Sequence, residues 1–197
     1  MSPLLVLSTT IALLNNIYYC IAIIKGRIKP HRTTRFVFVI IALTLTFSLF
    51  AQHNTTAIYL TGTFAIGCIV SFILSIKYGI GGWTKIDILC LILALLGICL
   101  WISTNNPTLA LYASIIADFA GVVPTIIKTF HHPNTEYWFT YFIDTIAGIL
   151  NIFANKTYSL NAIVFPLYII FINIIIILII YKSAYRRIFR NLRFHML

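Results

Sequence analysis

Long runs of apolar residues alternate with short polar breaks along the whole chain. A helix needs about 20 residues to cross about 30 Å of hydrocarbon, and each run is close to this length. Because the backbone inside lipid must form its hydrogen bonds within its own segment, we expect each run to be a helix. The pattern predicts an all-α membrane protein with seven transmembrane helices, over 4–24, 35–51, 57–76, 86–103, 107–127, 137–154 and 161–181.

The composition supports this prediction and excludes several classes of protein. Of the 197 residues, 60% are hydrophobic and 9% are charged, whereas a soluble domain is about 45–50% apolar and about 25% charged. A soluble enzyme and a disordered chain are therefore excluded. Seven spans use about 140 residues, so we expect no separate soluble domain between them.

The basic residues are distributed unevenly between the predicted loops. Fourteen Lys and Arg residues face four acids, which gives a net charge of +10. Thirteen of the cations fall on one side of the predicted membrane, and Lys156 falls alone on the other. Cytoplasmic loops carry the excess of Lys and Arg, so we predict that the N-terminus is outside and the C-terminus inside. We interpret the charge as a topology signal that also contacts anionic lipid, rather than as a nucleic-acid site.

The chain also carries an internal repeat. An offset of 103 residues brings the first three spans into register with the last three, and eight of the 37 pairs between 15–51 and 118–154 are then identical. The fourth span is left over as a linker, and this extra span gives both repeats the same orientation. Parallel repeats are related by an axis along the membrane normal, with a site near the midplane at their interface.

This 3+1+3 plan divides the chain into four parts. They are a first three-helix repeat over 1–78, a linker helix over 79–104, a second three-helix repeat over 105–182, and a basic cytoplasmic tail over 183–197.

Two of the four acids, Asp118 and Asp144, lie near the middle of predicted spans. A charge at the centre of a membrane helix costs roughly 2.5–3.5 kcal/mol on insertion scales. Such residues usually face the interior of a bundle or a water-filled cavity, and they often mark ion or solute pathways. We interpret the two acids as a proton-titrating or cation-binding pair. The alternative is that each is a structural carboxyl, hydrogen-bonded to a neighbouring helix.

Other polar side chains share helix faces with these acids. Asn151 follows Asp144 at i+7, and Thr125 follows Asp118 at i+7, which places each pair on one face. Under the repeat offset Asn15 aligns with Asp118, so we expect these two to hydrogen bond directly or to frame a small polar ligand. The alternative is that Asn15 holds neighbouring helices together.

Three further residues complete the predicted site. Pro124 removes a backbone donor inside the span over 107–127 and is expected to kink it, so it is a candidate hinge. Tyr18 and Asn173 are candidates for lining a cavity, with helix packing as the alternative. The predicted substrate or coupling-ion residues are Asp118, Asp144, Asn15, Asn151, Thr125, Tyr18 and Asn173.

Catalytic and metal chemistry have little support in the sequence. The five His residues lie outside the middle of every predicted span, so an intramembrane hydrolase lacks its usual base. The His, Cys and acidic residues form no cluster with metal-ligand spacing inside the spans. We therefore expect neither an enzyme nor a bound metal or cofactor.

Two short runs of residues carry a family resemblance. They are Gly26, Lys29, Pro30 and His31 after the first span, and Asp118-Phe-Ala-Gly121-Val-Val-Pro124-Thr125-Ile-Ile-Lys128 with Pro133 and Glu136. With the 3+1+3 plan, these runs resemble the PQ-loop superfamily, which includes the SWEET sugar transporters, and within it a group of uncharacterised bacterial seven-span proteins. The chain departs from the superfamily's motif, because Thr125 takes the place of Gln after Pro124 and the first half has Ile21-Ala22 there. The resemblance implies the fold, without a sugar or amino-acid specificity.

The buried acids and the architecture together predict a small-solute transporter of PQ-loop type, in which two three-helix units rock around a midplane site and Asp118 and Asp144 titrate or bind the coupling ion, a proton or another cation. The alternative is a non-transporting receptor, sorting or assembly protein, because the same superfamily includes a receptor. The expected partners are a small polar solute and membrane lipids, with no nucleic acid, and a homo-oligomer is left open. The Ile-rich composition and short loops favour the inner membrane of a bacterium.

Overall fold

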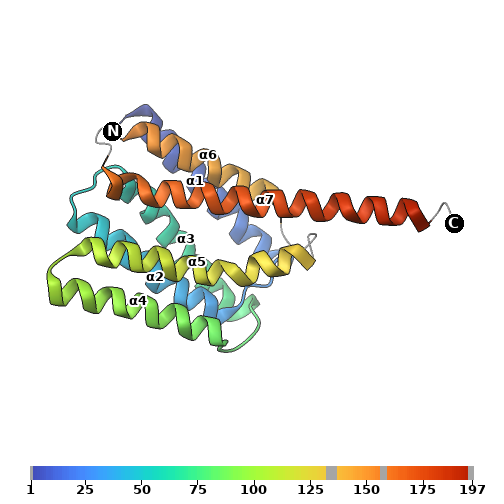
Figure 1. Ribbon diagram of the computed structural model, residues 1–197, viewed down its shortest axis with the longest axis horizontal. Coiled ribbons are helices and arrows are strands. Elements are labelled where there is room, and N and C mark those ends of the chain that lie inside the picture. The colour runs from blue at the N-terminus through green and yellow to red at the C-terminus, as the bar shows by residue number, and fades with distance from the viewer. Residues whose placement is uncertain (1, 132–136, 156–158, 195–197) are drawn as a thin grey trace.

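The computed structural model describes residues 2–131, 137–155 and 159–194, with side chains at all of these positions except 124, 125, 128, 131 and 183–194. The described residues form seven helices and no extended strand (Figure 1). The helices are α1 (Pro3–Ile24), α2 (Arg32–Ala51), α3 (Ala57–Tyr78), α4 (Lys85–Thr104), α5 (Pro107–His131), α6 (Trp138–Ala154) and α7 (Leu160–Phe194). The predicted helices are confirmed, with ends within four residues of those predicted except at the end of α7.

Helix length and hydropathy make the chain a multi-pass membrane protein. Within the described residues, five helices are long and apolar enough to cross a membrane, and Pro107–Val123 and Trp138–Ala154 are shorter apolar stretches. The sequence predicted seven full spans, but the 17 residues of α6 reach only about 25 Å at 1.5 Å per residue. The last helix is instead longer than predicted. It continues beyond the predicted end at 181 and projects past the other helices (Figure 1).

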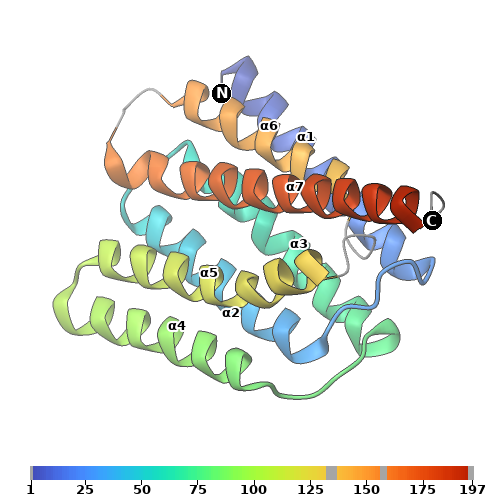
Figure 2. The same cartoon turned by 45° about the vertical axis from the view of Figure 1, so that its right-hand side comes forward.

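The helices pack in two groups of three with α4 at the side. In the first group α3 contacts both α1 and α2, and in the second α7 contacts both α5 and α6. The groups meet where α1 packs along α6 and where α2 packs along α5, and α4 lies against α5 and α2 (Figure 2). The core between the groups is built on one face of α2, where Val37, Ile41, Leu45 and Leu49 are buried.

One narrow stripe attaches α4 to the bundle. Its buried residues are Asp87, Cys90, Ala94 and Gly97, which recur every three or four positions and so lie on one face. A Cβ atom at Gly97 would lie 2.6 Å from the Cβ of Ala113, so the two helices approach closely at this point. Small residues at such contacts are typical of helix packing in membranes.

Two loops are joined at one end of the bundle, which we call the Pro30 end. The backbone N–H of Ile80 donates to the carbonyl of Pro30 at 3.0 Å, and the N–H of Arg32 donates to the carbonyl of Ile80 at 3.0 Å. The Arg32 guanidinium also donates to the carbonyls of Ser75 and Gly79 at 3.1 and 3.0 Å, near the last turn of α3. These bonds fix the first turn of α2, and with it the position of the residues that follow.

A buried carboxyl caps α4 beside the same loops. Asp87 accepts hydrogen bonds from the backbone N–H and the hydroxyl of Thr84 at 3.0 and 2.7 Å, and the hydroxyl of Thr33 on α2 lies 3.0 Å from the same carboxyl.

Asp87→Ala removes this acceptor, and we expect a loss of about 1–2 kcal/mol of stability, measured as a lower Tm in detergent micelles. The matched control is Thr104→Ala at the far end of α4, which is exposed and hydrogen bonds only to the carbonyl of Leu100 and the backbone N–H of Asn106. An equal loss in both variants would contradict the role assigned to Asp87.

Candidate functional site

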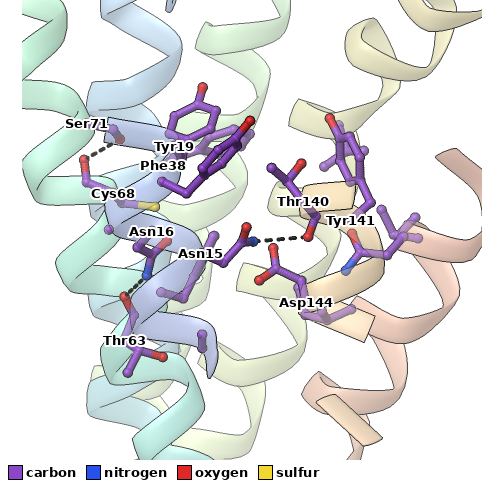
Figure 3. Close-up of a pocket in the computed structure, with 18 of the residues that line it drawn as sticks. Asn15, Asn16, Tyr19, Phe38, Thr63, Cys68, Ser71, Thr140, Tyr141 and Asp144 are labelled. Atoms are coloured by element: carbon purple, nitrogen blue, oxygen red, sulfur yellow. Dashed lines mark hydrogen bonds between the residues drawn. The ribbon is translucent and has the colours of Figure 1, made fainter. Parts of the chain in front are cut away.

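A cavity of about 490 Å³ lies between α1, α2, α3, α5, α6 and α7. Its lining combines apolar side chains with polar ones and with charged groups of both signs, and Figure 3 shows part of it. The polar and charged lining residues are Asn15, Asn16, Tyr18, Tyr19, Arg27, Arg35, Thr63, Cys68, Ser71, Asp118, Tyr137, Thr140, Tyr141, Asp144 and Asn173.

The cavity reaches from the middle of the bundle to the Pro30 end. Its exposed lining residues include Arg27 and Tyr137, which lie in the connections between helices at that end. At the other extreme the lining consists of apolar side chains, among them Leu60, Phe64 and Phe165. The cavity is therefore open at the Pro30 end and floored by packed apolar side chains in the interior.

Most of the site residues predicted from sequence meet in this cavity. Asp118, Asp144, Asn15, Tyr18 and Asn173 all line it, although they come from four different helices.

Of the three remaining predicted residues, the structure describes the side chain of one. Asn151 is fully buried outside the cavity, where its amide donates to the carbonyl of Thr56 at 3.3 Å. The side chains of Thr125 and Pro124 lie outside the described residues, and the backbone of α5 is helical through both positions.

Asp118 is held by groups from two other helices. Its side chain is 4% exposed, and the hydroxyl of Tyr168 on α7 donates to its Oδ2 at 2.5 Å. Arg35 of α2 is close enough to interact with the carboxyl electrostatically. A hydrogen-bonded carboxyl with a nearby cation is the arrangement that makes a buried acid tolerable. The direct bond to Asn15 that the repeat suggested is not present among the described contacts.

Asn15 instead joins α1 to α6. Its amide donates to the carbonyl of Thr140 at 3.0 Å and lies close enough to the carboxyl of Asp144 to interact with it. Figure 3 shows that the side chains of Asn15 and Asp144 face each other within the cavity lining. On the other side of α1, the amide of Asn16 donates to the carbonyl of Thr63 on α3 at 2.9 Å.

Asn173 brings a hydrogen-bond donor with no protein partner. The residue is 7% exposed, and its Nδ2 has no hydrogen-bond partner among the described residues. A buried amide donor without a partner carries a desolvation penalty of about 1–3 kcal/mol. Because Asn173 lines the cavity, it is a candidate donor to a molecule bound there.

Arg35 is a cavity residue that the sequence did not identify. Its guanidinium lies 4.9 Å from the centre of the Tyr19 ring and 5.8 Å from that of Phe38, and it donates to the Tyr19 hydroxyl. Stacking on aromatic rings is a common environment for a desolvated guanidinium. In the sequence Arg35 is one of five cations in a short basic stretch, so it was interpreted as part of the topology signal.

The opposite end of the bundle is closed by a polar cluster that we call the Asn161 clasp. The Asn161 amide donates to Gln52 Oε1 at 2.8 Å and to the Thr108 hydroxyl at 3.1 Å, and the Tyr112 hydroxyl donates to Asn161 Oδ1 at 3.2 Å. Beside it, the Ser48 hydroxyl donates to the carbonyl of Pro107. The clasp joins the end of α2 to the starts of α5 and α7.

Comparisons with protein-family models, with curated protein sequences and with solved structures give no match to this chain. Within the described residues, no group of three or more His, Cys, Asp or Glu side chains is placed to hold a metal ion. The cavity lining supplies carboxyls, amides, hydroxyls, a thiol and guanidinium groups.

A glycine of α3 makes room for one of the cavity amides. A Cβ atom at Gly67 would lie 2.4 Å from Oδ1 of Asn16, whereas one at Gly62 on the same helix would meet nothing within 4 Å. We expect Gly67→Ala to displace the Asn16 amide and break its bond to Thr63, lowering stability by about 1 kcal/mol.

The control is Gly62→Ala, which should leave Tm unchanged or raise it because alanine favours the helix. Thermal unfolding of both variants in the same detergent is the measurement. A Gly67→Ala variant as stable as Gly62→Ala would contradict the close packing of α1 on α3 at this point.

Proposed function

We propose that this protein is a small-solute transporter of the PQ-loop type, which binds its solute in the cavity between the two groups of three helices. The observation that carries the proposal is the cavity itself, because acids, an arginine and an unpaired amide donor converge there inside an apolar chain. Intramembrane ionisable residues that face a cavity commonly mark the path of a solute or ion.

The pattern of helix contacts supports two parallel repeats. The contacts of α3 with α1 and α2 have counterparts in the contacts of α7 with α5 and α6, and the packing of α1 on α6 has its counterpart in α5 on α2. This is the correspondence expected if α1–α3 and α5–α7 are the repeats and α4 is the linker. In transporters built this way, the solute site lies at the repeat interface near the midplane.

The two ends of the bundle suggest how solute access changes. The cavity is open at the Pro30 end, which the basic loop assigns to the cytoplasm, and the Asn161 clasp closes the other end. Rocking of one repeat against the other would separate Asn161 from Gln52 and open the external side. Pro124 is placed in α5 where bending would help this movement, because it cannot donate a backbone hydrogen bond.

Asp118 and Asp144 are the candidates for proton coupling. Both line the cavity, and they lie on helices of the second repeat that pack against the first. A proton taken up by either carboxyl changes its interaction with Arg35, Tyr168 or Asn15, all of which belong to other helices. The bacterial inner membrane is the location proposed for this activity.

The proposal predicts flux through the cavity. Protein reconstituted in liposomes should accumulate at least one member of a labelled panel of sugars, amino acids, amines and nucleosides when the exterior is more acidic than the lumen. Asn173→Ala should lower that flux roughly fivefold, because it removes one hydrogen bond to the solute.

Asn151→Ala is the matched control, since Asn151 is also a buried asparagine with one unpaired atom but lies outside the cavity. Its flux should match that of the unmodified protein. A solute that binds tightly but never enters the liposomes would contradict transport and favour a receptor, which needs a cavity open at one end only.

A further inference from the structure

The two carboxyls in the cavity have different partners. Asp118 has the Tyr168 hydroxyl at 2.5 Å and lies within the electrostatic reach of Arg35. Asp144 has the neutral amide of Asn15 beside it. Among the described side chains, no Lys or Arg nitrogen lies within 4.0 Å of the Asp144 carboxyl. Among the described side chains, Arg35 therefore interacts with Asp118, whereas Asp144 has no Lys or Arg within ion-pair distance.

Inside a membrane protein, a carboxylate that has no cationic partner favours the binding of a cation. An isolated charge is strongly disfavoured in a low-dielectric interior, and pairing with an opposite charge relieves this penalty. A bare ion does not account for the rest of the site, because the cavity of about 490 Å³ is large enough for an organic molecule. The space favours a positively charged group that belongs to a larger solute.

The rest of the cavity defines that solute further. Asn173 offers a buried N–H with no partner, so it calls for an acceptor oxygen on the solute. Apolar side chains of α7 line the same space, which suits an apolar body: Phe165, Ile169, Ile172 and Ile176. Tyr18 and Tyr137, whose ring centres are 6.0 Å apart, stand among the lining residues and can face a cation.

We propose that Asp144 binds the protonated amine of a small solute whose neighbouring oxygen accepts a hydrogen bond from Asn173. This inference rests on the proposed function, because it names the class of solute that the transporter takes. A carboxylate and a hydroxyl both supply the required oxygen, so amino acids and amino alcohols share the recognised chemistry.

Four probes with one apolar body test the inference. Leucine carries the amine and a carboxylate, leucinol carries the amine and a hydroxyl, isocaproate carries only the carboxylate, and isohexanol carries only the hydroxyl. With the full-length protein in detergent at neutral pH, we expect leucine or leucinol or both to raise Tm, and isocaproate and isohexanol to leave it unchanged. The stronger of the first two identifies the oxygen that Asn173 prefers.

Variants of Asp144 assign the effect to this carboxyl. Asp144→Asn should weaken amine binding by at least about tenfold, because a charge-assisted hydrogen bond is lost. Asp144→Glu should retain binding, and Asn151→Ala outside the cavity should bind as the unmodified protein does. If Asp144→Asn does not fold, the probe series and Asp144→Glu still decide the question.

Three results would overturn the inference: stabilisation by isocaproate or isohexanol equal to that by leucine, unchanged amine affinity in Asp144→Asn, or no stabilisation by either amine. The proposed function fails separately. Flux of a solute that lacks an amine would leave transport standing and remove the amine site. Amine binding that depends on Asp144 but gives no flux would leave the site standing and remove transport.

Discussion

A polar side chain inside a membrane protein must find its partners within the protein or in a water-filled space, because lipid offers none. This constraint organises the whole molecule. Between the two helix groups, polar side chains gather in the cavity and in the Asn161 clasp, and apolar packing on α2 lies between these two places. Polar contacts of this kind also join the groups directly: Ser8 of α1 donates to the carbonyl of Ala147 on α6 at 2.7 Å.

These polar contacts lie mainly where the two groups of helices meet. Asn15 connects α1 to α6, Arg35 and Asp118 interact between α2 and α5, and Asn161 connects α7 to the end of α2. Such contacts are weak individually, at about 0.6 kcal/mol on average in membrane proteins. The interface between the two groups combines several such weak bonds with the apolar core on α2.

The fold was predictable from the sequence to a large extent, whereas the site was predictable only in part. The apolar runs located all seven helices, because periodicity and length are local properties. Asp118, Asp144, Asn15, Tyr18 and Asn173 were identified because a polar residue in the middle of an apolar run is conspicuous. Arg35 was not, because a basic residue near a span end is ordinary. Tyr168 and Asn161 gave no local signal either, since their roles depend on which helices become neighbours.

The most direct test of alternating access needs no knowledge of the solute. Cys68 lines the cavity, and Cys90 is buried outside it. In a variant that keeps only Cys68, a membrane-impermeant thiol reagent should label this residue from the cytoplasmic face in inverted vesicles. With Asn161→Ala added to open the clasp, labelling should also occur from the external face in intact cells, and a variant that keeps only Cys90 should stay unlabelled in both. If Cys68 is labelled from one face only, both with the intact clasp and with Asn161→Ala, alternating access is contradicted.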